Sequence, residues 1–429
     1  MNWKKKIKYF LLDKINPYRI EYYKKQNKEK SYKKSLRKEK INIVFVCHRP
    51  AIWGYQKTIF EACISDIDFD VTIVAIPNKK ELPQAGLLHE VYESEGAEEY
   101  FKEYPCRVIN GYNYETHEWF DLKELKPDYV FFQTPYNICR PKLYHSKEVN
   151  KFARICYVHY GLSMLKDQCV FKEFAKEFFQ YCSLIFAETE YHKRSYKDEI
   201  IKYNSRFNFN NIFLSGSPVF DNLKPYKDAE SSLWRHRNHE NFRIIWTPRW
   251  STGENNCNFL EYKDELFGYA ENNNYDFIFR PHPQAFLNYI AEDIMSEADI
   301  ESLKKDYTNS KNCTLDLSKD YLATLYSSDV LISDPSGIDF EYLLTGKPII
   351  YTKKSDEWAN DFAKNVFIAV SYVVTNWDEL QKTLEMLRNG NDPMKKKRAE
   401  IVEKYFYFPE NGAGYTIKEL IKKDFYGKN

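Results

Sequence analysis

Short apolar runs alternate with helix-compatible segments from residue 41 onward. The first series of runs comprises Ile41–Cys47, Val71–Ile76, Tyr129–Phe132, Arg154–Val158 and Leu184–Ala187. Runs of this length, apolar throughout, are typical of strands buried on both faces of a sheet. The segments between them that have helical spacing are 55–65, 171–182 and 191–203. Strands that alternate with helices predict βαβ units and a parallel sheet.

A second series follows a polar, proline-containing stretch at 216–241, which predicts a linker. Its expected strands are Arg243–Thr247, Asp276–Arg280, Val330–Ser333 and Pro348–Tyr351, and its expected helices are 285–296, 321–328, 338–345, 377–388 and 415–425. The pattern predicts an α/β protein with two Rossmann-like domains, 41–220 and 221–410, that face a cleft, followed by a C-terminal helix at 411–429. Ligands of such domains bind at the carboxyl ends of the strands.

Residues 1–40 form a basic leader, with 15 Lys and Arg against 4 Asp and Glu, whereas the whole chain has a net charge of only +1. Apolar positions from Trp3 to Ile15 have helical spacing and lysines take the other face, so we expect a short helix that Pro17 ends. Three interpretations stay open: binding to an anionic membrane surface, an inert leader, or binding to nucleic acid. The rest of the chain has no nucleic-acid-binding signature, which disfavours the last.

The composition excludes several classes of protein. No apolar run approaches the ~18 residues that a membrane span needs. The nine cysteines are scattered and fit neither a disulfide framework nor a zinc site, which indicates reduced thiols in the cytosol. With 14 glycines and no dinucleotide-binding, P-loop or nucleophile-elbow motif, the chain is not expected to bind a cofactor or a metal. The acidic run at 66–70 is interpreted as a solvated turn.

The segment from Ser333 to Tyr342 carries the strongest candidate chemistry. A Ser-Asp-Pro-Ser-Gly turn follows a strand and opens a helix, with Ser336 as the expected N-cap. Such a turn directs backbone N–H groups toward one point and suits a phosphate or diphosphate. The hydroxyls of Ser333 and Ser336 could add bonds, and Glu341 could receive a ribose diol. The alternative is an ordinary strand-to-helix connection.

Two further strand ends offer cations. Arg280 and His282 lie in an Arg-Pro-His-Pro turn, where Arg provides a planar fork for phosphate and His a proton carrier. Arg249 follows another strand in a Trp-Thr-Pro-Arg-Trp run. The alternative for His282 is an incidental surface position.

His159 ends an expected strand of the first domain and suits a general base with a pKa near 7. A structural histidine is the alternative. His48, Gln133 and Tyr136 also follow strands, so they are weaker candidates for the binding of a second substrate.

These motifs together resemble those of the CDP-glycerol glycerophosphotransferases, the TagF- and TagB-like polymerases and primases of teichoic acid and capsule synthesis. The run from Ser333 through Tyr342 to Lys347–Tyr351 resembles the family's S-D-Y-S-S-V-x-F-D-Y … K-P-I-I-F signature. Arg280–Pro283 is similar to its second His motif, and His159, Gly161 and Lys166 to its W-H-G-T-x-x-K segment. Tyr160 separates His159 from Gly161, and Pro335 and Gly337 replace a Tyr and a Ser.

The resemblance implies a GT-B fold and a cytosolic enzyme held at the inner face of the plasma membrane. Such an enzyme transfers glycerol phosphate from CDP-glycerol to a polymer or lipid-linked glycan acceptor and releases CMP. It implies His159 and His282 as catalytic residues. The donor would be held by Arg249, Arg280, Ser333, Asp334, Ser336, Gly337 and Glu341, and the acceptor by His48, Gln133, Tyr136 and Lys166. Two alternatives stay open: a GT-B glycosyltransferase that uses a UDP- or CMP-sugar, and a non-catalytic scaffold of envelope assembly.

Overall fold

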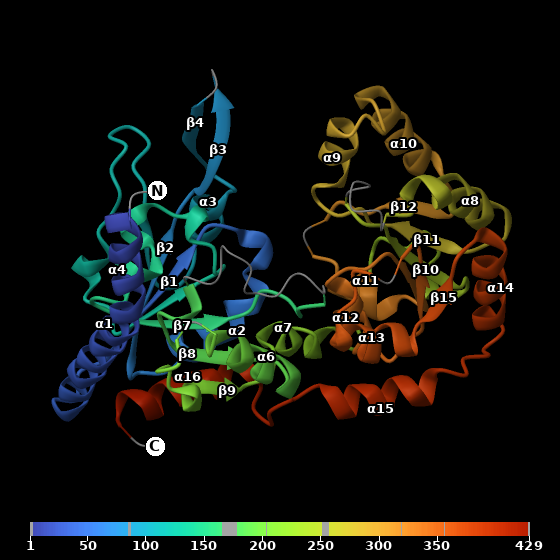
Figure 1. Cartoon of the computed structure of the whole chain (residues 1–429). Coiled ribbons are helices and arrows are strands. Elements are labelled where there is room, and N and C mark those ends of the chain that lie inside the picture. Colours follow the sequence, from blue (N-terminus) through green and yellow to red (C-terminus); the bar gives the residue numbers. More distant parts are fainter. Residues whose placement is uncertain are drawn as a thin grey trace. The chain divides into compact units, whose positions relative to one another are not determined.

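The chain forms two compact units in a computed structural model that describes residues 3–84, 87–164, 178–202, 204–250, 257–318, 320–355 and 357–427 (Figure 1). Unit 1 comprises Met1–Ser163, Gln168–Asn222 and Phe406–Asn429, and unit 2 comprises Met164–Asp167 and Leu223–Tyr405. Contacts therefore divide the chain after Asn222 and again after Tyr405. The domain boundaries predicted from the sequence lie at 40/41, 220/221 and 410/411.

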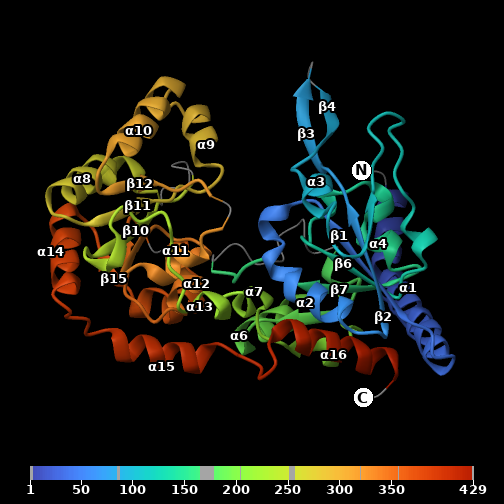
Figure 2. The ribbon, with the colours of Figure 1, turned by 180° about the vertical axis from the view of Figure 1, so that it is seen from behind.

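Unit 1 is built on a seven-stranded parallel sheet in the order β5-β2-β1-β6-β7-β8-β9. The strands are β1 (Ile41–Cys47), β2 (Phe69–Ala75), β5 (Arg107–Asn110), β6 (Tyr129–Phe132), β7 (Arg154–Val158), β8 (Cys182–Ala187) and β9 (Ile212–Leu214). Its helices are α1 (Trp3–Leu36), α2 (Gly54–Ile64), α3 (Ala97–Phe101), α4 (Ser146–Val149), α6 (Glu190–Ile200), α7 (Pro218–Asp221) and α16 (Ala413–Phe425). A separate antiparallel hairpin, β3 (Asn78–Gln84) and β4 (Leu87–Glu93), projects from this unit in both views (Figure 2).

Two hydrophobic clusters cover the two faces of this sheet. Along β1, Ile43 and Phe45 belong to one cluster and Val44 and Val46 to the other, as the alternation of side chains along a strand requires. From Ile43 to Cys47 the strand is buried on both faces, and over these residues its sequence is continuously apolar. The C-terminal helix α16 joins the cluster of Ile43, and Figure 1 shows it beside the strands of unit 1.

The expectation that Pro17 ends the N-terminal helix is wrong, because α1 continues to Leu36 with Pro17 inside it. A proline within a helix costs about 3 kcal/mol. Contacts with unit 1 offset that cost. One face of α1 is buried at helical spacing, and Asn27 Nδ2 on that face donates to the carbonyls of Asn150 (2.8 Å) and Ala153 (3.2 Å). The buried face consists of Ile20, Lys24, Asn27, Ser31 and Lys34.

Helix α16 is fixed to unit 1 at its beginning by Asp221. This carboxylate accepts hydrogen bonds from the backbone N–H groups of Ala413 and Gly414, both at 2.9 Å. Gly414 lies so close to Thr58 that a Cβ there would come within 2.4 Å of the Thr58 backbone. Farther along α16, Lys422 forms ion pairs with Asp66 (3.0 Å) and Asp68 (2.7 Å). The acidic turn at 66–70, which was expected to be only solvated, therefore contacts α16.

Unit 2 is built on a six-stranded parallel sheet in the order β12-β11-β10-β13-β14-β15. The strands are β10 (Arg243–Thr247), β11 (Asp276–Phe279), β12 (Cys313–Leu315), β13 (Val330–Ser333), β14 (Ile349–Thr352) and β15 (Tyr372–Val374). The helices are α8 (Phe259–Asn272), α9 (Ala285–Ala291), α10 (Glu297–Asn309), α11 (Leu322–Ser327), α12 (Ile338–Leu343), α13 (Asp361–Val366), α14 (Trp377–Arg388) and α15 (Lys395–Tyr405).

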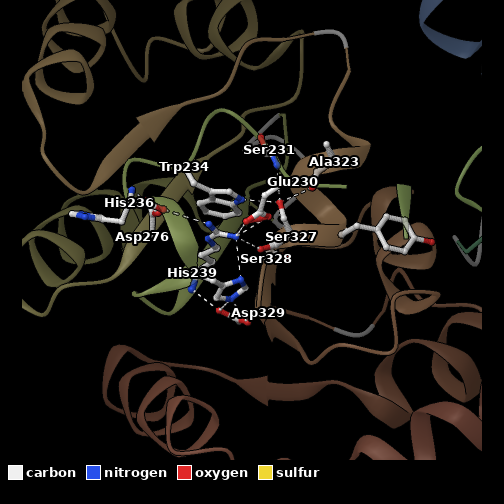
Figure 3. A network of polar contacts seen from close by, with 12 residues as sticks. Glu230, Ser231, Trp234, His236, His239, Asp276, Ala323, Ser327, Ser328 and Asp329 are labelled. Carbon is white, nitrogen blue, oxygen red and sulfur yellow. Dashed lines mark hydrogen bonds and ion pairs between the residues drawn. The ribbon is translucent and has the colours of Figure 1, made fainter. Parts of the chain in front are cut away.

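A polar network attaches the segment before β10 to the amino-terminal edge of this sheet (Figure 3). Asp276, the first residue of β11, accepts hydrogen bonds from the backbone N–H groups of Arg235 (3.0 Å) and His236 (3.1 Å). Trp234 Nε1 donates to the Ser327 hydroxyl at 2.8 Å. The part of the expected linker that contains these residues is therefore bound to unit 2.

Candidate functional site

The carboxyl-terminal edge of the unit 2 sheet collects the candidate donor-binding residues. Asp316, Arg280 and Asp334 directly follow β12, β11 and β13, and Arg249 comes two residues after β10. These four strands are consecutive neighbours in the sheet. Residues that are scattered over about 85 positions of the sequence therefore meet at one edge, where parallel α/β sheets bind ligands.

Arg280 is held by a buried acid and an aromatic ring. Its Nη1 donates to Asp316 Oδ2 at 2.6 Å, and the Asp316 side chain has no exposed surface. Its Nη2 donates to the Ser318 carbonyl at 3.1 Å, and the guanidinium lies 4.6 Å from the centre of the Tyr321 ring. Tyr321 in turn donates its hydroxyl proton to Glu341 Oε2 at 2.7 Å. Arg280 and Glu341, both predicted from the sequence, are thus joined through Tyr321.

Asp334 is the first residue of the β13–α12 loop and is completely buried. Its Oδ2 accepts from the backbone N–H groups of Arg249 and Asn258, both at 2.9 Å, and its Oδ1 accepts from Asn258 Nδ2 (2.8 Å) and Thr352 Oγ1 (2.7 Å). Burial raises the Asp334 pKa, and these hydrogen bonds to the ionised form oppose the increase. With its oxygens occupied, Asp334 organises the loop from within, where the sequence predicts a donor contact.

The remaining loop residues differ in exposure. Ser333 is fully buried, and its hydroxyl accepts from Thr247 Oγ1 at 2.9 Å. Ser336 is half-buried and Gly337 is exposed. The prediction of Ser336 as the N-cap of α12 is wrong, because Gly337 takes that position and no side chain caps the helix. The Ser336 N–H instead donates to Asp339 Oδ2 at 2.8 Å.

Arg249 and His282 lie on the same edge. Arg249 is half-buried, and its Nη1 donates to the Pro335 carbonyl at 2.8 Å. His282 is exposed, its Nδ1 accepts from the Gln284 N–H at 3.2 Å, and its ring centre lies 6.2 Å from that of Trp250. The exposed ring of His282 is therefore able to meet a ligand.

The carboxyl-terminal edge of the unit 1 sheet holds the residues predicted to bind the second substrate. His48 and Gln133 follow the neighbouring strands β1 and β6 and are buried. Gln133 Oε1 accepts from the backbone N–H groups of His48 and Arg49, both at 2.8 Å. Burial, with the charges of Arg49 and Arg140, lowers the His48 pKa to about 3. Gln133 therefore ties two strand ends together, and His48 is neutral.

His159 follows β7, the next strand of the same edge, and is half-buried. Its Nδ1 contacts the Gly161 carbonyl, and its ring stacks on Tyr160 with 5.0 Å between centres. The Tyr160 hydroxyl is 3.0 Å from that of Tyr136, another predicted residue. The expected pKa near 7 is wrong, because desolvation lowers the His159 pKa to about 4.

Several residues at these edges were not identified from the sequence. Glu188 and His192 lie beyond β8, are buried, and interact electrostatically with the His159 segment. Burial raises the Glu188 pKa to about 8. In unit 2 the residues that were not identified from the sequence are Asp316 and Tyr321. Asp316 follows the short edge strand β12, and Tyr321 directly precedes α11, so no long apolar run marks either position. Glu188 directly follows the buried strand β8, and an acidic residue at that strand end is the signal that could have identified it.

Lys166, the fourth residue predicted to bind the acceptor, lies outside the described residues. In the described part of the chain, no group of three or more His, Cys, Asp or Glu side chains is placed to hold a metal ion.

The comparison with known families bears directly on these edges. The family of CDP-glycerol:poly(glycerophosphate) glycerophosphotransferases matches residues 162–423, which is more than half of the chain. The chain belongs to this family. The family match includes Arg280, His282 and the segment 333–342, so the resemblance found in the sequence is confirmed.

A curated protein is also similar to this chain in sequence. The minor teichoic acid biosynthesis protein GgaB of Bacillus subtilis (strain 168) is 25% identical over 239 residues, which are 52% of this chain. The chain spans only about a quarter of the length of that relative.

Solved structures share the fold. The wall teichoic acid polymerase TagF has a TM-score of 0.58 at 14% identity, over 96% of this chain and 98% of that one. The UDP-GlcNAc 2-epimerase of Methanocaldococcus jannaschii has a TM-score of 0.55 at 14% identity, over 89% of this chain and 99% of that one. The prediction of an α/β protein with two Rossmann-like domains of the GT-B class is thereby confirmed.

Proposed function

We propose that the protein transfers glycerol phosphate, or a related polyol phosphate, from a CDP-activated donor to a hydroxyl of a cell-envelope polymer or glycan, releasing CMP. The observation that carries this proposal is the edge of unit 2, where Arg280 is preorganised by Asp316 beside the loop of the family signature. A guanidinium already held in place by hydrogen bonds loses little freedom when it binds a diphosphate.

The donor's diphosphate would bind at Arg280, Arg249 and the 335–337 turn, and Glu341 would accept hydrogen bonds from the ribose. Buried Asp334 and Ser333 support this turn from below. In the reaction the acceptor oxygen attacks the phosphorus that bears glycerol, and the bond from that phosphorus to the CMP oxygen breaks. Catalysis of this kind depends mainly on positioning and on the stabilisation of charge.

His159 would accept the proton of the attacking hydroxyl. Contact of Nδ1 with the Gly161 carbonyl favours the tautomer with the proton on Nδ1, which leaves Nε2 as the acceptor. A pKa of about 4 makes His159 a weak base, but one that is unprotonated at neutral pH. His48, Gln133 and Tyr136, at the same edge of unit 1, would line the place where the acceptor binds.

Thermal unfolding in the presence of nucleotides tests the donor. CDP-glycerol at 100 times its dissociation constant should stabilise the protein by about 2.7 kcal/mol, and CMP should stabilise it less. The double variant Arg280→Gln, Asp316→Asn removes both charges together, so no buried carboxylate is left unpaired, and it should lose the response. Arg388→Gln, at an exposed arginine of α14, is the matched control and should keep the response.

The other outcomes separate the alternatives. Stabilisation by UDP or UDP-sugars alone would contradict the polyol-phosphate donor and favour a glycosyltransferase. If no nucleotide stabilises the protein, the proposed transferase activity is contradicted and a scaffold becomes the better interpretation.

The proposal includes residence at the inner face of the plasma membrane, through α1. No described helix combines the length and hydropathy that a membrane span requires. The side of α1 that faces away from the rest of unit 1 is basic and aromatic, with Tyr18 and Tyr22 57% and 58% exposed. Its exposed cations between residues 18 and 34 are Arg19, Lys25, Lys28, Lys30 and Lys33. Such a surface suits an anionic lipid leaflet.

Co-sedimentation with vesicles tests this surface. Reversing Lys25, Lys30 and Lys33 to Glu should weaken binding to phosphatidylserine-containing vesicles at least about a hundredfold, at about 1 kcal/mol per basic residue. The control reverses Lys395, Lys396 and Lys397, three exposed lysines of α15, and should bind as the unchanged protein does. Equal binding of both triple variants would contradict a membrane role for α1.

A further inference from the structure

Asp339 is a buried carboxyl that contacts the 335–337 turn, where the diphosphate is proposed to bind. It is the second residue of α12 and has no exposed surface. Its Oδ2 accepts the Ser336 N–H at 2.8 Å, so the backbone donor expected to face a phosphate already faces an internal carboxyl. The proposed function does not use Asp339, although it lies next to the residues that would bind the donor.

The surroundings of Asp339 hold two other charged groups, Asp334 and Arg249. Burial raises the pKa of Asp339 to about 8, and the Asp334 charge adds to this, while Ser333, Ser336 and Arg249 oppose it. Asp334 is stabilised by four hydrogen bonds and Asp339 by fewer, so a proton near this loop will reside on Asp339.

A diphosphate at the loop would bring further negative charge toward this pair of acids. It would also compete with Asp339 for the field of Arg249, whose Nη1 is held at the Pro335 carbonyl of the same loop. A diphosphate and the Asp339 carboxyl group lie close together at lower free energy when the carboxyl group is protonated and neutral. We propose that donor affinity is coupled to the protonation of Asp339, so that a charged Asp339 takes up a proton from solvent when the donor binds.

The coupling rests on the proposed function and involves no bond to the donor. The Asp339 carboxylate and one proton from the buffer become a carboxylic acid, which no longer competes with the phosphates for the positive field of Arg249. The folded-state pKa is raised, so the neutral form predominates below about pH 8 and the charged form above it. Donor binding should therefore weaken as the pH rises through 8 and 9.

Calorimetric titration of the full chain with CDP-glycerol, in buffers of different ionisation enthalpy, counts the protons taken up. We expect close to none at pH 6.5 and about half a proton at pH 9. The donor itself has no phosphate group that titrates in this range. Over the same range the dissociation constant should rise about five- to tenfold from pH 7 to pH 9.

Asp339→Asn keeps an acceptor for the Ser336 N–H and removes the titrating group. It should abolish the proton uptake and flatten the pH dependence of the dissociation constant. Asp306→Asn, at an exposed acid of α10, is the matched control and should change neither. Proton uptake that persists in Asp339→Asn, or its absence from the unchanged protein at pH 9, overturns the inference.

Failure of the proposed function gives a different result. In that case the unchanged protein binds no CDP-glycerol at any pH, and no heat is seen in any buffer. Because the test on the unchanged protein needs no variant, an unstable Asp339→Asn protein would not prevent a decision.

Discussion

Replacing His159 with Ala should lower the turnover of CDP-glycerol at least about 100-fold. Loss of a positioned general base costs 100- to 10,000-fold, and His159 has its Nδ1 fixed at the Gly161 carbonyl, so its Nε2 is oriented for one task. The initial rate of CMP release in the presence of acceptor measures this. The Michaelis constant for the donor should change little, because the donor is proposed to bind residues of unit 2.

Two controls distinguish a base from a structural histidine. His117→Ala removes an exposed histidine of unit 1 and should leave the rate unchanged. In the unchanged protein, the fall in rate that comes from protonating His159 should occur near pH 4, since burial lowers the pKa of its imidazole to about 4 and only the neutral form accepts a proton. A near-normal rate in His159→Ala would remove this residue from the mechanism.

The central strands could be predicted from the sequence because they are buried on both faces. The expected bounds of β1, β6, β7, β10 and β13 agree with the structure, since each has a central apolar run that is buried on both faces of its sheet. The edge strands β5, β9, β12 and β15 were missed. They have three or four residues and are only partly buried, so their apolar runs are too short to indicate a strand.

Tertiary contacts explain the remaining differences. Pro17 is a strong local signal for the end of a helix, but the interactions of Asn27 and other buried residues of α1 with unit 1 outweigh it. The expected helix 285–296 ends early, because α9 stops at Ala291 and residues 292–296 connect it to α10, which begins at Glu297. Of the expected helix 171–182, residues 171–177 lie outside the described residues, and Cys182 begins β8.

The candidate site was predictable where a residue follows a central strand. Arg280 and the 333–337 turn were identified because β11 and β13 are apolar and clearly bounded. Asp316 was not, because it follows the edge strand β12, although it is the acid that orients Arg280. Asp339 shows a further limit, since its burial and its contact with the Ser336 N–H depend on how the loop folds over it.

Replacing His282 with Ala should also lower turnover at least about 100-fold, and here the fold should be left intact. The His282 side chain is exposed and its ring lies beside Trp250, so its removal creates no cavity in the core. Exposed substitutions of this kind change the free energy of unfolding by no more than about 0.5 kcal/mol. The melting temperature should therefore shift by no more than about 2 °C.

The physical reason for the large effect on rate is the position of His282 after β11, two residues beyond Arg280. The Gln284 N–H donates to Nδ1, and we propose that the other ring nitrogen, Nε2, donates a proton or a hydrogen bond to the oxygen of the departing CMP. Single-turnover CMP release measures the step itself. Gln284→Ala keeps the backbone N–H that holds Nδ1 and should retain the rate. If His282→Ala retained it as well, donor activation would have to rest on Arg280 and the 333–337 turn alone.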